Sequence, residues 1–97
     1  EQYVARFAAR IRELFTNCPR GRERTIAEFA CRKHSGRIGR SAAAKQLDDE
    51  AIRLAVTAHV RHIETNYDEL LSRGHDRTDA RHHVHGQIEQ VLRAWVN

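Results

Sequence analysis

The segment of the chain best suited to chemistry is residues 35–41, which read SGRIGRS. Its two glycines let the backbone turn tightly, so that successive N–H groups can surround an anion. Arg37 and Arg40 would add charge-assisted hydrogen bonds to that anion, and a helix beginning at Ser41 would add its free N–H groups. The segment therefore predicts a phosphate-binding loop. The same pattern is equally typical of a helix–helix connector, and it lacks the GxxxxGK[ST] pattern of a nucleotide-hydrolysing loop.

Basic side chains surround this loop in the sequence. Residues 20–45 hold eight basic and two acidic side chains. Residues 1–45 carry eleven basic and four acidic side chains (net +7), and residues 46–97 carry six and nine (net −3), which sum to the +4 of the chain. Such an excess is typical of a protein that binds the phosphate backbone of nucleic acid. The predicted contact residues are Arg20, Arg24, Arg32, Lys33, Ser35, Gly36, Arg37, Gly39, Arg40, Ser41 and Lys45.

Two features favour backbone contacts over the recognition of DNA or RNA bases. The seven-residue loop is longer than the three- or four-residue turn of a helix-turn-helix protein, and aromatic side chains are scarce in the basic half. The positive charge also fits two roles that involve no nucleic acid. The basic side chains can form a solvated face, or they can meet acidic groups of a protein partner or of a second copy of the chain.

A second polar group lies between residues 59 and 68. His59, His62, Tyr67 and Asp68 can form an acid–base constellation, because an imidazole and a nearby carboxylate tune each other's pKa. His59, however, shares a helical stripe with apolar residues. A core histidine that is hydrogen-bonded to a polar neighbour is therefore the favoured interpretation of His59. A polar network that fixes a helix kink would use the same residues.

The cysteines and histidines predict neither a metal site nor a cofactor. The spacing from Cys18 and Cys31 to the two histidines of that group matches no zinc finger or ribbon. Neither cysteine has the surroundings of a nucleophile, and Cys31 is expected to pack in the core. A binding module is therefore favoured over an enzyme.

Apolar residues spaced three and four apart predict an all-α fold, a compact bundle of four to five helices. The expected helices span residues 3–15, 22–34, 47–66 and about 77–95, with a short helical turn at 42–44. Residues 67–72 either extend the third helix or follow a kink at Thr65 and Asn66, and Gly74 ends them. Asp76 or Thr78 is expected to cap the last helix. The expected core is Val4, Phe7, Ala8, Ile11, Leu14, Phe15, Ile26, Phe29, Ala30, Ile52, Val56, Val60, Ile63, Tyr67, Ala80, Val84, Ile88, Val91, Leu92 and Trp95.

The length of 97 residues corresponds to one domain. We expect a single helical domain from a longer protein, because the chain begins with Glu1 and contains no methionine. Two cysteines indicate a reducing, cytoplasmic compartment. The sequence shows neither a signal peptide nor a stretch apolar enough to span a membrane.

Three strings of the sequence form a recognisable set: NCPRGRERTIAEFACRKHSGRIGRSAAAK, LDDEAIRLAVTAHVRHIETNYDELLSRG and DARHHVHGQIEQVLRAW. Their marks are the turn at Cys18 and Pro19, Cys31, the loop of residues 35–41, and the segments AHVRH and TNYD. Over residues 11–95 the chain resembles domain of unknown function family 2293, which occurs in bacterial and fungal proteins. The resemblance implies no activity, cofactor or partner. It implies that the loop and the histidine–tyrosine–aspartate segment are features that members of this family share. The histidines at positions 75, 82, 83 and 85 are not family features.

Overall fold

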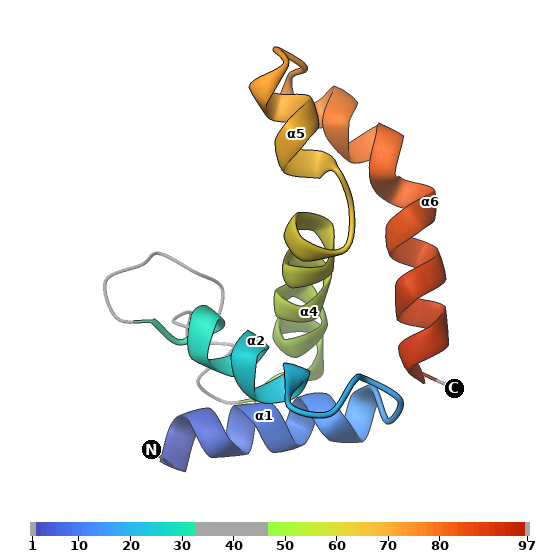
Figure 1. The fold of residues 1–97 in the computed structure, drawn as a ribbon. Helices are drawn as coiled ribbons and strands as arrows, with labels where there is room; N and C mark the ends of the chain where they lie inside the picture. Colours follow the sequence, from blue (N-terminus) through green and yellow to red (C-terminus); the bar gives the residue numbers. More distant parts are fainter. Residues whose placement is uncertain (1, 33–46, 97) are drawn as a thin grey trace.

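The computed structural model describes residues 2–32 and 47–96, and in these two ranges the chain forms five helices and no strand (Figure 1). The predicted all-α fold is confirmed. The predicted helical turn of residues 42–44 lies outside the described residues. The helices are α1 Gln2–Leu14, α2 Arg22–Ala30, α4 Asp49–Ile63, α5 Tyr67–Ser72 and α6 Arg77–Val96.

Helix α1 forms the base of the bundle in Figure 1 and packs against both α2 and α4. Its buried side chains recur every three or four residues, which places them on one face of the helix. After α1 the chain turns through Pro19 and reaches Gly21, whose φ of +87° is the left-handed conformation that glycine adopts most easily. α2 begins at the next residue.

Helix α2 is shorter than predicted and buries a different face. It ends at Ala30, and the next two residues, Cys31 and Arg32, are not helical. Ile26, Ala27 and Ala30 are buried, whereas Phe29 is 38% exposed. The prediction that Phe29 is a core residue is therefore wrong. One face of α2 packs on α1 and α4, and Phe29 lies about a quarter turn to the side of it.

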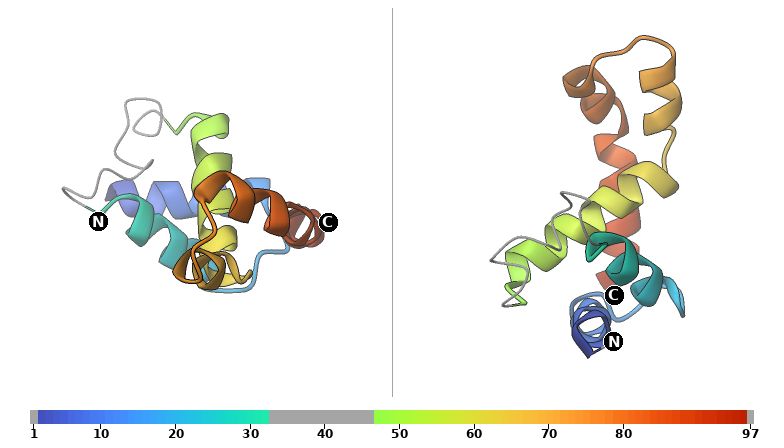
Figure 2. Two further views of the ribbon diagram at one scale, coloured as in Figure 1. Left: turned by 90° about the horizontal axis from the view of Figure 1, so that it is seen from above. Right: turned by 90° about the vertical axis from the view of Figure 1, so that its left-hand side faces the viewer.

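Helix α4 runs through the middle of the molecule and contacts α1, α2, α5 and α6 (Figure 2). Asp48 caps its first turn by accepting a hydrogen bond from the backbone N–H of Ala51 (3.3 Å). The stripe of Ile52, Val56 and Val60 is fully buried, as predicted. Ile63 was expected to continue this stripe but is 62% exposed, because it is the last residue of α4, where the chain turns away toward α5.

The last two helices form an arm that returns along α4. The chain bends at residues 64–66 before α5, and Gly74, with a φ of +100°, follows α5 as predicted. Asp76 caps α6 by accepting a hydrogen bond from the N–H of Asp79 (2.7 Å). The far end of α6 reaches the end of α1, where the N–H of Asn17 donates to the carbonyl oxygen of Trp95 (2.7 Å).

Most of the predicted core is buried. Val91, Leu92 and Leu14 are only partly buried and pack at its edge. Cys18 and Cys31 are both buried, which confirms the packing role expected of Cys31. In residues 2–32 and 47–96, no helix combines the length and the apolarity that a crossing of the membrane needs.

Candidate functional site

The structure describes three residues of the predicted phosphate-binding surface. Its described members are Arg20, Arg24 and Arg32, which lie in or beside α2. Arg24 pairs with Glu28 one turn away (3.0 Å). Arg20 is exposed and forms no ion pair with any described residue. The guanidinium of Arg32 lies over the ring of Phe29, 5.1 Å from the ring centroid. The remaining predicted contact residues lie outside the described residues: Lys33, Ser35, Gly36, Arg37, Gly39, Arg40, Ser41 and Lys45.

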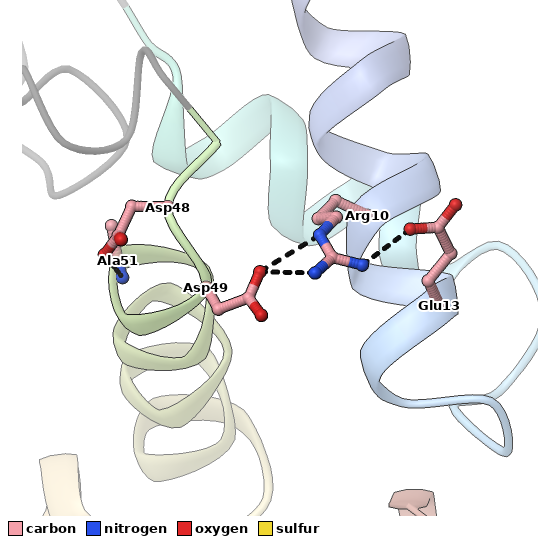
Figure 3. A network of polar contacts seen from close by, with 5 residues as sticks. All are labelled: Arg10, Glu13, Asp48, Asp49 and Ala51. Carbon is pink, nitrogen blue, oxygen red and sulfur yellow. Dashed lines mark hydrogen bonds and ion pairs between the residues drawn. The ribbon is translucent and has the colours of Figure 1, made fainter.

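Several arginines of the basic half hold helices together. Arg10 of α1 donates from Nε (3.1 Å) and Nη2 (2.5 Å) to Oδ1 of Asp49, the first residue of α4 (Figure 3). Its third nitrogen, Nη1, donates to Glu13 (2.7 Å). These hydrogen bonds to Glu13 and Asp49 raise the pKa of Arg10 above its ordinary value. The charged side chain of Arg10 therefore links α1 to α4 through its ion pair with Asp49.

Arg12 and Arg22 join helices in the same way. Arg12 donates from Nη1 to the carbonyl oxygen of Cys18 (2.5 Å) and from Nη2 to Glu23 of α2 (2.5 Å). Burial opposes the charge on Glu23, but backbone hydrogen bonds and Arg12 outweigh it and hold the pKa of Glu23 below its usual value. Arg22 of α2 pairs with Glu64 at the end of α4 (2.5 Å). Part of the basic excess seen in the sequence is thus used within the fold.

The structure brings together three of the four residues in the second polar group. Nδ1 of His62 lies 2.7 Å from Oδ1 of Asp68, and the ring of His62 meets that of Tyr67 edge to face with centroids 5.3 Å apart. Thr65 shapes the bend between them, because its hydroxyl donates to the carbonyl oxygen of Arg61 and accepts from the N–H of Tyr67 (3.1 Å). This is the kink-fixing network that the sequence allowed.

His59 occupies the core, one turn before that network. Its burial confirms the interpretation as a core histidine. Burial, and then the charge of Arg22, lowers the pKa of His59, which favours the neutral form of the ring. Nε2 of His59 has no hydrogen-bond partner among the described residues. The expected hydrogen bond to a polar neighbour is therefore not found at that nitrogen.

The chemical capacity of this second group is limited. The side chains of His62 and Asp68 are 45% and 63% exposed, so their contact is an exposed pair at a helix bend. Burial raises the pKa of the Cys18 thiol, which disfavours the nucleophilic thiolate. In the part of the chain that the structure describes, no three histidine, cysteine or acidic side chains gather as they would around a metal ion.

Two adjoining pockets between α4 and α6 were not expected from the sequence. Both are lined by Thr57, Glu89 and Leu92, and their volumes are about 420 and 410 Å³. The larger one reaches the end of α1. The other is lined by Arg61 of α4 and Arg81 of α6. Among the described residues, neither of these arginines forms an ion pair with a carboxylate.

A signal for these pockets is present in the sequence. Arg53, Thr57 and Arg61 are spaced four residues apart, which places them on one polar stripe of α4. Such a stripe is usually taken as a solvent-facing surface. That interpretation fails for Thr57 and Arg61, which are only partly exposed, because α6 returns along α4 and forms the opposite wall.

Comparison with known proteins supports the family resemblance. The model of family DUF2293, described as "uncharacterized conserved protein", matches residues 10–96. Neither the curated proteins nor the solved structures contain a match to this chain.

Proposed function

This chain belongs to the DUF2293 family, and we propose that it is a small basic helical module that binds nucleic acid mainly through phosphate contacts. The observation that carries the proposal is the distribution of charge after the described ion pairs are assigned. Both acidic residues among residues 20–45 face arginines of the helices: Glu23 pairs with Arg12, and Glu28 with Arg24. The adjoining residues 33–46 carry four basic side chains and no acidic one.

The chemistry of these side chains fits the phosphate backbone. Residues 20–32 contain four arginines. The side chains of Arg22, Arg24 and Arg32 contact other described residues. Arg20 is exposed and forms no ion pair among the described residues. Residues 33–46 add two arginines and two lysines between α2 and α4 in the sequence. Arginine donates two parallel hydrogen bonds to phosphate, and each phosphate that is neutralised releases counterions. Binding of this kind depends little on base sequence and falls steeply with salt.

The proposal is tested by the binding of the 97-residue chain to a labelled duplex and a labelled single strand. Affinity should fall steeply between about 50 and 200 mM salt. The double variant Arg37→Glu, Arg40→Glu should lose binding at both salt concentrations without a lower melting temperature. The matched control reverses two described arginines that are not among the predicted contact residues, Arg73→Glu and Arg77→Glu. Equal losses in the two double variants, or no binding at low salt, would count against the proposal.

A second candidate is a protein-interaction or self-association module. The observation that favours it is a set of large apolar side chains left exposed on the surface. A partner would gain apolar burial by covering any of them, although single exposed apolar residues are also common on monomers. Sedimentation at several protein concentrations, without nucleic acid, distinguishes this candidate from the first. The exposed residues are Phe29, Leu54, Ile63 and Val96.

A further inference from the structure

The pocket of about 410 Å³ between α4 and α6 presents positive charge from both of its walls. Arg61 lies on the α4 wall and Arg81 on the α6 wall. Several other arginines of the described residues are ion-paired, as Arg22 is with Glu64 and Arg73 with Glu69. Neither Arg61 nor Arg81 is ion-paired with a carboxylate among the described residues, so these two like charges repel each other. That repulsion is relieved when an anion lies between them.

Arg61 is held at the pocket by its surroundings. Its Cζ lies 5.7 Å from the centroid of the Tyr67 ring, and its Nε is buried without a hydrogen-bond partner among the described residues. Burial, and then the charge of Arg81, lowers the pKa of Arg61 from its ordinary value, although arginine stays protonated at neutral pH. The structure therefore keeps a partly desolvated cation beside a second cation, an arrangement that favours the binding of a compact dianion.

We infer that this pocket is a binding site for a phosphate group, with Arg61 and Arg81 as its two cationic contacts. The hydroxyl groups of Thr57 and Thr78 also line it and can donate to phosphate oxygens. The pocket is within the size range of small-molecule sites, which begins at roughly 300 Å³.

The remaining lining residues indicate how the rest of a ligand would lie. Ile88 and Leu92 supply apolar surface, so an apolar group attached to the phosphate can pack there. Glu89 is the acidic member of the lining, and it lies 3.8 Å from both His85 and Arg93. The positive charge of Arg93 offsets that of Glu89. Since Thr57, Glu89 and Leu92 also line the adjoining pocket, the phosphate is expected toward the other end, which is formed by Arg61, Arg81 and Thr78.

This site does not include the described residues of the surface assigned to nucleic acid, which are Arg20, Arg24 and Arg32 in or beside α2. α2 and α6 lie on opposite sides of α4 in both Figure 1 and Figure 2. Two sources can supply the phosphate group, a small phosphomonoester or a strand of nucleic acid. The chemistry of recognition is the same for both, and the inference does not depend on the function proposed above.

The experiment follows the Nε–H signal of Arg61 by nuclear magnetic resonance in the ¹⁵N-labelled 97-residue chain. Phenyl phosphate is the probe, because it joins a phosphate to an apolar ring, and phenol is the control ligand without the phosphate. Phenyl phosphate should shift the signal saturably and phenol should not. Arg81→Gln should weaken the binding about tenfold or more, since hydrogen bonds to charged groups are among the strongest.

The matched control is Arg77→Gln, which removes the same charge from the same helix one turn away and outside the pocket. It should change the affinity by less than twofold. No saturable shift of Arg61, or equal weakening by the two variants, would overturn the inference. Both variants change exposed side chains, so a folding failure is not expected to confuse the result.

A final arm identifies the source of the phosphate. A short oligothymidylate without terminal phosphates is titrated into the chain that is saturated with phenyl phosphate. Displacement of phenyl phosphate assigns the pocket to nucleic acid, whereas no displacement assigns it to a small phosphomonoester, and both results support a phosphate site. Loss of nucleic-acid binding in the Arg37→Glu, Arg40→Glu variant with phenyl phosphate binding retained would show that the two sites are independent.

Discussion

Arg22 and Glu64 form an ion pair of 2.5 Å that joins the start of α2 to the end of α4. The two residues are 42 positions apart in the sequence, and both side chains are 29% exposed. The same guanidinium lies over the ring of Trp95 in α6, with Cζ 5.7 Å from the ring centroid. One arginine of the basic half thus links its own helix, α2, to the end of α4 and to α6.

We expect Arg22→Gln to lower the free energy of unfolding by about 1 kcal/mol, near the upper end of the range for partly exposed ion pairs. Urea unfolding at neutral pH measures the change, and a double-mutant cycle with Glu64→Gln isolates the pair. Arg24→Gln is the control, because the pair of Arg24 with Glu28 is local to one helix and more exposed. A loss in the control as large as that in Arg22→Gln would contradict the assigned role.

The buried His59 makes stability depend on pH. Its pKa is lowered in the folded protein, so on acidification the unfolded chain takes up a proton at this site before the folded chain does. The contribution of neutral His59 to the free energy of unfolding is therefore fully present above the pKa of the unfolded chain, about 6.5. It is lost as the pH falls toward the lower pKa of His59 in the folded protein. Melting temperatures measured between pH 7.5 and 5 should decline, and His59→Leu should reduce the decline. An unchanged decline in that variant would assign it to other histidines.

The positions of the helices can be predicted from the local spacing of apolar residues. Which side chains of each helix are buried cannot be predicted exactly in this way. The spacing of Val4, Phe7 and Ile11 is enough to place α1, because one face of it is covered by neighbours along its length. Phe29 and Ile63 have the same apolar character and spacing but are exposed. Whether an apolar residue is covered depends on where the next helix crosses, and no local spacing encodes that crossing.

The candidate sites could likewise be predicted from the sequence only where their residues lie close together along the chain. The contact of His62 with Asp68 spans a single helix bend, so the sequence could indicate it. The pocket of Arg61 and Arg81 depends on the return of α6 along α4, which brings together residues twenty positions apart on different helices. Ion pairing between helices also has to be seen in three dimensions, since Arg10 pairs with Asp49 and Arg12 with Glu23, which are distant in the sequence.

Helix α4 should be the element most sensitive to loss of packing. Ile52 is fully buried and faces the core, so Ile52→Ala is expected to lower the free energy of unfolding by about 2–5 kcal/mol. Leu54 lies on the same helix but is 48% exposed, and Leu54→Ala should change stability by roughly 0.5 kcal/mol or less. Urea unfolding of the two variants makes the comparison. Similar losses in both would show that α4 does not present the face described here.

Two glycines of the C-terminal arm should respond to alanine in opposite directions. Gly74 has a φ of +100°, which an alanine adopts only with strain, so Gly74→Ala is expected to lower the free energy of unfolding by about 1 kcal/mol or more. Gly86 lies inside α6, and a Cβ added there meets no atom within 4 Å. Gly86→Ala should therefore raise stability by about 0.5–1 kcal/mol, because alanine loses less backbone entropy on forming a helix. Thermal and urea unfolding of both variants measure the two signs. A stabilised Gly74→Ala variant would show that the turn between α5 and α6 is not held in the left-handed conformation, and a destabilised Gly86→Ala variant would show that α6 is packed there by a neighbour.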